Sequence, residues 1–100
     1  MDDYRVTFSA QAVRDLEEIV HFMAQRNPLS AERLGYALID TASSLSAFPK
    51  RGLAMQGRRG FWRILHRPWF LLFYRIDDAR RIVEVARIWD ARQDPATFTF

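Results

Sequence analysis

The stretch WFLLFYRI, residues 69–76, begins with six consecutive apolar or aromatic side chains and has no charged residue before Arg75. A strand that reads as a continuous apolar run, without alternation of apolar and polar residues, is typically buried on both faces of its sheet. The run is far too short to cross a bilayer as a helix. Residues 69–76 are therefore predicted to form a central strand, for which the rest of the chain must supply neighbouring strands and a covering layer.

Three other segments are predicted to be the neighbours of this strand. Residues 61–66 read as a strand, and the short HRP connection that follows suits a tight turn. After a DDA turn, residues 80–89 are rich in Val and Ile and form the predicted last strand. Residues 3–9 alternate apolar and polar side chains with a period of two, which predicts a short first strand.

Two amphipathic helices are predicted between the first strand and the other three. Ser9 can cap the first helix, and the sequence RNP at 26–28 is predicted to end it, with Asn27 in a left-handed conformation. The second helix is predicted to begin near Ser30 and to end at Pro49. Their apolar stripes are Ala12, Leu16, Ile19 and Met23 in the first helix, and Leu34, Leu38, Leu45 and Phe48 in the second.

The predicted order β-α-α-β-β-β makes one α+β domain over residues 1–100, with a small antiparallel β-sheet packed against an N-terminal antiparallel helical hairpin. The chain contains no cysteine, so that disulfides and thiolate metal sites are excluded. Gly52, Gly57 and Gly60 are not followed by the GK[ST] of a phosphate-binding loop, and Glu17 with His21 is too small a set for a metal site. We expect a cytoplasmic protein that needs no cofactor, metal or membrane.

Basic residues are concentrated in the second half of the chain. Residues 1–49 carry four Arg and seven acidic residues, a net charge of −3, whereas residues 50–100 carry eleven Lys or Arg and five acidic residues, a net charge of +6. Arginine can bind phosphate or carboxylate in a bidentate manner. The prevalence of Arg over Lys fits a GC-rich genome equally well, but codon usage explains the difference between the two halves less readily.

Several arginines are candidates for binding an anionic partner. Arg63 and Arg75 belong to neighbouring predicted strands, and alternation can direct both to one face of the sheet together with Arg87. Such a face suits a phosphate backbone or an acidic partner segment. The same side chains can equally well cover the solvent side of the sheet with their aliphatic parts. The aromatic residues Phe61, Trp62 and Trp69 fit core packing better than base stacking.

Cleavage of RNA through its 2′-hydroxyl would need groups that accept and donate a proton, in addition to cations that stabilise the transition state. The candidates for proton transfer are Lys50, His66, Glu84 and Asp90. His66 fits a surface position beside a turn, and Glu84 fits an ordinary cross-strand ion pair with Arg63 or Arg75. No convergent acid–base pair can be assigned from these residues.

Six motifs in register resemble the RelE/ParE superfamily of bacterial toxins and together cover nearly the whole chain. They are A-x-x-D-L-x-x-I at Ala12, Asp15, Leu16 and Ile19; P-x-x-A at Pro28 to Ala31; L-x-x-x-P at Leu45 to Pro49; the segment from Gly57 to Arg63, a position that the family keeps as Arg; FYRI at 73–76; and an R-x-D-P-like end at Arg92 to Pro95. The resemblance implies a small antiparallel sheet flanked by a helical hairpin, which agrees with the reading from periodicity.

The resemblance leaves two branches open. ParE-like members have a long helical hairpin and poison DNA gyrase, whereas RelE-like members cleave mRNA in the ribosome with basic residues, often with a C-terminal tyrosine and sometimes a histidine. In this chain Trp89 and Asp90 stand where the family commonly has a histidine, and the tail has Phe98 and Phe100 but no tyrosine. The ParE-like branch is therefore favoured, with growth arrest and plasmid stabilisation as implied outcomes.

The alternatives are an mRNA endoribonuclease and a degenerate toxin that only binds an antitoxin. If the chain is a nuclease, the expected catalytic residues are Lys50, Arg63, His66 and Arg75. The resemblance also implies a cognate antitoxin that wraps the hairpin and the sheet within a toxin–antitoxin hetero-oligomer and often carries a DNA-binding domain. Arg58 and Arg59 lie between two glycines in a predicted loop. The expected partner-binding residues are Arg58, Arg59, Arg63, Arg75, Arg87 and Arg92.

Overall fold

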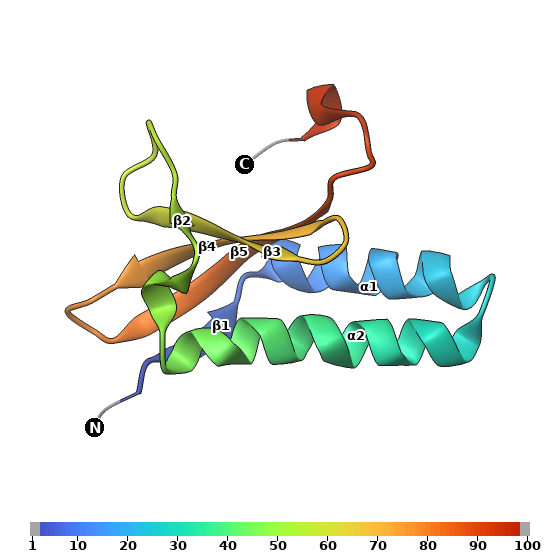
Figure 1. Ribbon diagram of the computed structural model, residues 1–100, viewed down its shortest axis with the longest axis horizontal. Helices are drawn as coiled ribbons and strands as arrows, with labels where there is room; N and C mark the ends of the chain where they lie inside the picture. The colour runs from blue at the N-terminus through green and yellow to red at the C-terminus, as the bar shows by residue number, and fades with distance from the viewer. Residues whose placement is uncertain (1–2, 99–100) are drawn as a thin grey trace.

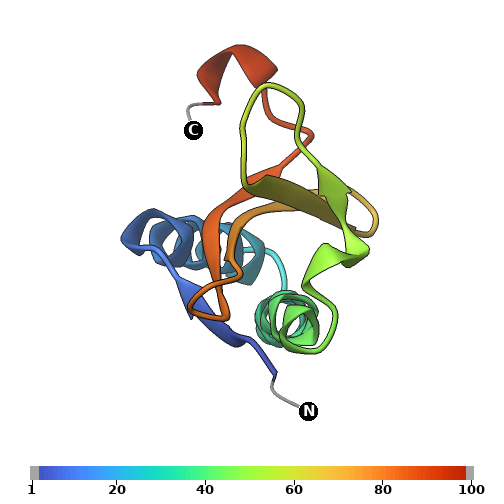
Figure 2. The same ribbon diagram turned by 90° about the vertical axis from the view of Figure 1, so that its left-hand side faces the viewer.

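The computed structural model describes residues 3–98, in which a helical hairpin covers one face of a five-stranded sheet (Figure 1). A loop between β2 and β3 and the C-terminal tail both rise from the other face (Figure 2). The elements are β1 (Arg5–Phe8), α1 (Ala10–Ala24), α2 (Pro28–Ser43), β2 (Leu53–Ala54), β3 (Phe61–His66), β4 (Phe70–Asp77) and β5 (Ile82–Asp90), with 3₁₀ turns at Ser44–Ser46, Pro49–Arg51 and Pro95–Thr97.

The strand order is β1-β5-β4-β3-β2, so that β4 occupies the predicted central position. The α+β fold and the order of its elements are confirmed, with the two-residue strand β2 added at the edge. One pairing differs from an all-antiparallel sheet, because β1 runs parallel to β5. Alternation specifies which side chains of β1 are buried, but it carries no information on the direction of the neighbouring strand.

Two helix boundaries differ from the prediction. Ser9 caps α1 as expected, but Asn27 has φ −154° and its side chain caps α2 by accepting the amide of Ser30, so the left-handed assignment was wrong. Pro28 is then the first residue of α2, a position at which the missing amide costs nothing. The helix also ends at Ser43, before Pro49; next to this end, the hydroxyl of Ser44 donates to the carbonyl of Thr41.

The core lies between the hairpin and the sheet. Its largest fully buried side chains are Tyr74, Leu38, Leu45, Leu72, Val83 and Val85. Phe48 was predicted to share the apolar stripe of the second helix, but it is 69% exposed because the helix ends five residues earlier. The remaining predicted stripe residues of both helices lie in this core or against it, except Met23, which is half-buried.

Asp15 joins the hairpin to the sheet where β1 ends. The pairing of β1 with β5 stops at Phe8 and Val85, and the edge of β5 continues beyond it. There the hydroxyl of Ser9 donates to the carbonyl of Ala86, and the Asp15 carboxylate accepts the amide of Ile88 at 3.0 Å. Side chains from the start of α1 therefore take over the edge hydrogen bonds that a longer β1 would have made.

Within residues 3–98, neither helix is long and apolar enough to span a membrane.

Candidate functional site

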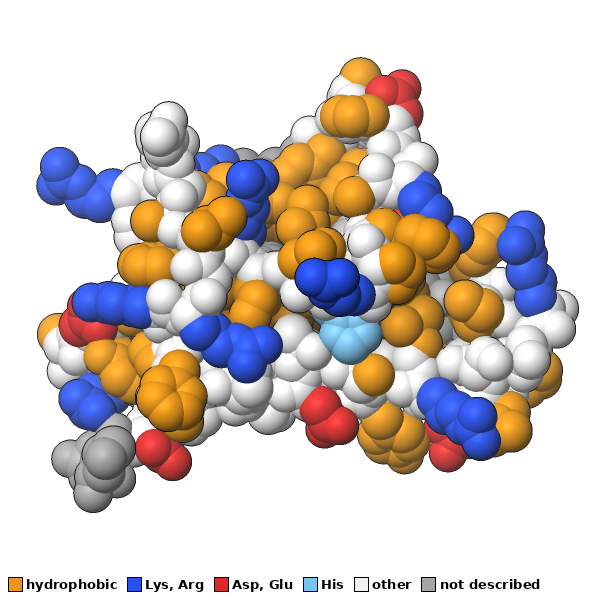
Figure 3. All heavy atoms as spheres, in the orientation of Figure 1, with side chains coloured by type: hydrophobic (Ala, Val, Ile, Leu, Met, Phe, Trp, Pro, Cys, Tyr) orange, Lys and Arg blue, Asp and Glu red, His pale blue; other side chains and the backbone are white. Residues whose placement is uncertain are grey.

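The face of the sheet opposite the hairpin, called the outer face below, carries two of the predicted arginines. Ile64, Leu72 and Tyr74 point into the core, so that alternation directs Arg63 of β3 and Arg75 of β4 to the outer face. Figure 3 shows hydrophobic side chains gathered between the two projections of this face, with basic side chains among them. The structure thus places Arg63 and Arg75 on one face as predicted, whereas Arg87, which was predicted to join them, pairs in register with Phe73 but directs its guanidinium to Asp15 of α1.

Arg63 and Arg75 are diagonal neighbours on adjacent strands. Arg63 pairs in register with Phe73, so Arg75 lies two residues further along β4, a spacing of about 7–8 Å between such positions. Arg75 lies opposite Glu84, with 3.9 Å between Nη2 and Oε1 and with 55% and 41% of the two side chains exposed. An exposed pair at this distance contributes little to stability, so Arg75 can exchange Glu84 for another anion.

The loop that leads into β3 presents Arg58 and Arg59 at the side of the outer face. Gly57 and Gly60 flank them with φ of +76° and +83°, a backbone conformation that favours glycine. The guanidinium of Arg58 lies 4.9 Å from the centre of the Phe61 ring, and Arg59 is exposed. Four of the six predicted partner-binding arginines, Arg58, Arg59, Arg63 and Arg75, therefore belong to one end of the outer face or its border.

The other two predicted arginines are engaged within the chain. Arg87 has only 15% of its side chain exposed and binds Asp15 through two hydrogen bonds of 2.8 and 3.1 Å. Arg92 binds Asp90 with two hydrogen bonds of 3.0 and 2.6 Å and lies 4.1 Å from the centre of the Trp69 ring. The hydrogen bonds from Arg92 lower the pKa of the Asp90 carboxyl below its ordinary value.

The residues proposed for a nuclease are not brought together. The His66 Nδ1 lies 2.7 Å from the Thr41 hydroxyl of α2, on the hairpin side of the sheet, whereas Arg63 and Arg75 are on the outer face. Lys50 lies in the turn after α2, 3.9 Å from Asp78 at the β4–β5 turn. Of the proposed proton-transfer groups, Glu84 is the one that the register places beside Arg75.

The C-terminal tail covers the apolar part of the outer face. The ring centre of Phe98 lies 5.0 Å from that of Phe73 and 4.6 Å from that of Trp89. The guanidinium of Arg87 lies 5.2 Å from the same ring. Phe73 is consequently only 5% exposed although it points away from the core, and Trp89 packs against the same ring of the tail. Phe100 lies outside the described residues.

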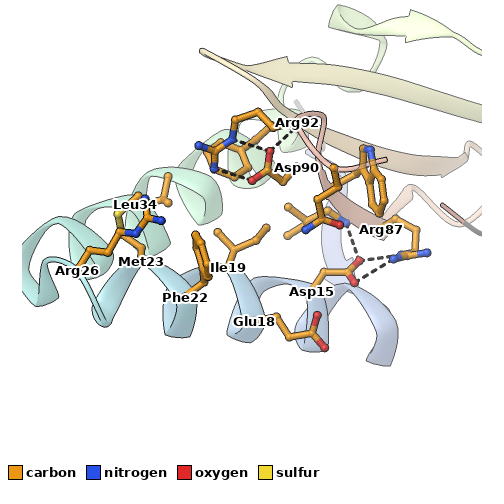
Figure 4. A pocket seen from close by; sticks show the side chains of 14 residues that line it. Asp15, Glu18, Ile19, Phe22, Met23, Arg26, Leu34, Arg87, Asp90 and Arg92 are labelled. Carbon is orange, nitrogen blue, oxygen red and sulfur yellow. Dashed lines mark hydrogen bonds and ion pairs between the residues drawn. The ribbon is translucent and has the colours of Figure 1, made fainter. Parts of the chain in front are cut away.

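A second surface, which the sequence did not reveal, is a groove of about 570 Å³ between α1 and the part of β5 beyond β1 (Figure 4). Ile19, Phe22 and Met23 of α1 contribute apolar lining, and Phe22 is 53% exposed. Glu18 and Arg26 lie toward opposite ends of the groove (Figure 4). Periodicity could not have indicated this surface, because it depends on where β1 stops pairing with β5.

Within residues 3–98, no group of three or more His, Asp or Glu side chains is placed to hold a metal ion. The outer face offers the guanidinium groups of its arginines, and Glu84 is the carboxylate placed beside Arg75. Arginine remains protonated near neutral pH, so these side chains can bind anions but cannot transfer protons.

Comparison with known protein families identifies the family to which the chain belongs. A family model described as the ParE toxin of the type II toxin–antitoxin system parDE matches residues 6–95. No curated protein sequence matches the chain.

Several solved structures share the fold. The chain is similar to the chromosomal ParDE toxin–antitoxin system from Pseudomonas aeruginosa, with a TM-score of 0.75, 15% identity and coverage of 88% of this chain and 96% of that one. It is also similar to the toxin–antitoxin complex RelBE2 from Mycobacterium tuberculosis, with a TM-score of 0.69, 29% identity and coverage of 93% and 97%. Its similarity to the isolated Escherichia coli RelE toxin has a TM-score of 0.58 and 17% identity, with coverage of 93% of this chain and 89% of that one.

Proposed function

The chain belongs to the ParE family of type II toxin–antitoxin toxins, and from this premise we propose that it acts by inhibiting DNA gyrase. The family match over residues 6–95 is the observation that carries the proposal. The arrangement of the outer face supports it, because Arg63 and Arg75 lie there while His66 is bound to Thr41 on the opposite side of the sheet. A protein that acts by binding needs such a charged surface and no proton-transfer pair.

A ribosome-dependent mRNA endonuclease is the second candidate. The observation that favours it is the 29% identity with the RelBE2 complex, which is higher than the 15% identity with the ParDE system. In that case Arg63 and Arg75 would stabilise the negative charge on the oxygens of the pentavalent phosphorus, Glu84 beside Arg75 would accept the proton of the 2′-hydroxyl, and the leaving oxygen would take its proton from water.

Two assays separate these candidates. Purified protein added to DNA gyrase and relaxed plasmid should reduce supercoiling and trap complexes in which the DNA is cleaved. No effect at micromolar concentrations would contradict the gyrase proposal. Mapping of transcript ends after induced expression should show intact mRNA, and new cleavage sites would favour the nuclease. Expression without growth arrest would instead indicate a degenerate toxin that only binds its antitoxin.

We also propose that a cognate antitoxin neutralises this chain by binding both surfaces described above. Structures with the same fold include the complexes RelBE2, E. coli RelBE and E. coli DinJ–YafQ, each of a toxin with its antitoxin. The groove beside α1 offers exposed apolar area at Phe22. The arginines of the outer face suit an acidic segment, which would give the complex electrostatic complementarity.

The charged part of this contact can be tested by calorimetry with the purified antitoxin. The double variant Arg63→Glu, Arg75→Glu should weaken binding by about tenfold or more, because two attractive contacts become repulsive. The matched control Arg14→Glu, Arg33→Glu makes the same change of net charge on exposed positions of the hairpin and should have a much smaller effect. Equal affinities for the two double variants would place the acidic segment elsewhere.

A further inference from the structure

The outer face offers a partner a group of arginines at one of its ends. Arg58, Arg59, Arg63 and Arg75 lie on it or at its border, and Arg75 also lies 3.9 Å from the carboxylate of Glu84. These four arginines belong to the half of the chain with a net charge of +6. Such a surface attracts a nucleic acid or another polyanion whatever the sequence of that polyanion.

Several aromatic rings of this face are engaged in contacts within the chain and are only partly exposed. Phe61 has the guanidinium of Arg58 over its face, and Phe98 lies against both Phe73 and Trp89. Proteins that hold single-stranded nucleic acid combine a basic groove with open aromatic platforms on which successive bases stack. Contacts to the backbone of a duplex need only the basic groups, because its bases are already stacked in the helix.

We propose that the outer face binds the phosphate backbone of double-stranded DNA through Arg58, Arg59, Arg63 and Arg75, without reading its sequence. The inference rests on the proposed function, since gyrase holds duplex DNA and an inhibitor on the enzyme can contact that DNA. The arginines would then add affinity for the gyrase–DNA complex over gyrase alone. An acidic antitoxin segment on the same arginines would compete directly with the DNA, which gives neutralisation a physical basis.

The inference is tested without gyrase, by fluorescence anisotropy of a labelled 20-base-pair duplex titrated with the protein at several salt concentrations. The wild-type protein should bind with an affinity that falls steeply with salt. The double variant Arg63→Gln, Arg75→Gln should bind at least tenfold more weakly at low salt, and its salt slope should be smaller by about two, one for each lost phosphate contact. Circular dichroism verifies that the variant is folded.

Two controls make the outcome decisive. The variant Arg14→Gln, Arg33→Gln has the same net charge as the variant Arg63→Gln, Arg75→Gln, and it should bind the duplex nearly as well as the wild type. An equal loss in both double variants would overturn the inference, because binding would then follow net charge alone. A single-stranded RNA of the same length should bind more weakly than the duplex, and tighter binding to the RNA would also overturn it.

Failure of this inference can be distinguished from failure of the proposed function. Binding of the duplex without inhibition of gyrase would contradict the gyrase proposal and support the DNA-binding face. Inhibition of gyrase by a protein that does not bind the duplex at low salt would contradict the DNA-binding face alone.

Discussion

Tyr74 shows at the scale of one residue how the sheet holds the loop that follows the hairpin. Its side chain is fully buried, and its hydroxyl donates to the carbonyl of Pro49 at 2.7 Å and accepts the amide of Gly52 at 3.2 Å. A Cβ at Gly52 would lie 2.6 Å from that hydroxyl and would also overlap the carbonyl oxygen of Arg63. A side chain at position 52 is therefore excluded by close approach of the backbone.

Replacement of Tyr74 by Phe should lower the free energy of unfolding by about 1–3 kcal/mol at neutral pH, because two backbone groups lose a buried partner. Burial is the main cause that raises the pKa of this phenol above its ordinary value of 10.0. The folded state thus retains the proton more strongly than the unfolded state. The stability that depends on this proton is complete below pH 10 and is lost as the pH rises through the raised pKa.

Urea unfolding of the wild type and Tyr74→Phe at pH 8 and pH 11 checks both effects. The difference in stability between the two proteins should be smaller at pH 11. A difference that does not change with pH would show that the Tyr74 hydroxyl is not the titrating group.

At the scale of elements, the C-terminal tail is held by contacts at both ends. Its start is tied by the Arg92–Asp90 pair, and the carboxylate of Asp94 accepts the amide of Ala96 to cap the 3₁₀ turn Pro95–Thr97. Its described end places Phe98 on Phe73. The tail is therefore a covering element of the sheet, although no regular periodicity marks it in the sequence.

Replacement of Phe98 by Ala should uncover Phe73 and Trp89 and lower the free energy of unfolding by about 1 kcal/mol, the order expected for loss of aromatic contacts. The variant should also bind more of the dye 1-anilinonaphthalene-8-sulfonate. Phe48→Ala is the matched control, because Phe48 is 69% exposed and its loss should change neither measurement. Equal dye binding by the wild type and Phe98→Ala would contradict the covering role.

At the scale of the whole molecule, the hairpin and the sheet are joined by an ion pair in addition to the apolar core. Asp15 is 6% exposed and accepts hydrogen bonds from the side chains of Gln11 and Arg87 and from the amide of Ile88. Without this carboxylate, the amide of Ile88 at the edge of β5 would need an acceptor from water or from a longer β1. The pair therefore fixes the position of α1 against β5 and forms one end of the groove.

Replacement of Asp15 by Asn should lower the free energy of unfolding by about 3 kcal/mol, since it removes the carboxylate charge that the mostly buried Arg87 binds at 2.8 Å. Chemical denaturation measures the loss. Glu84→Gln is the control, because this exposed pair has 3.9 Å between its atoms and should contribute less than about 1 kcal/mol. Similar losses for the two variants would mean that Asp15 does not join the two layers as described.

Much of the fold was predictable because it depends on local periodicity. The apolar run at 69–76 specified the central strand, and the stripes beginning at Ala12 and Leu34 specified a hairpin that must cover a sheet. The end of the second helix at Ser43 was not predictable from its apolar stripe, which continues to Leu45, whereas Asn27 followed by Pro28 is a helix-start signal that the prediction assigned to the end of the first helix. The motif A-x-x-D-L-x-x-I contains Asp15 but does not indicate its contacts with Arg87 and Ile88, which are more than seventy residues away in the chain.

The candidate site also has a part that the sequence predicted and a part that only tertiary contacts decided. Alternation allowed Arg63, Arg75 and Arg87 to share one face, and the register of β3 with β4 decided this for Arg63 and Arg75. Sequence by itself therefore determined the layers, the central strand and the composition of the basic half. Only the tertiary structure decided that Arg87 and Arg92 are bound to Asp15 and Asp90, that His66 faces α2, and that a groove lies beside β5. Those outcomes depend on contacts between residues distant in the chain and on where β1 stops, and neither leaves a periodic signal in the sequence.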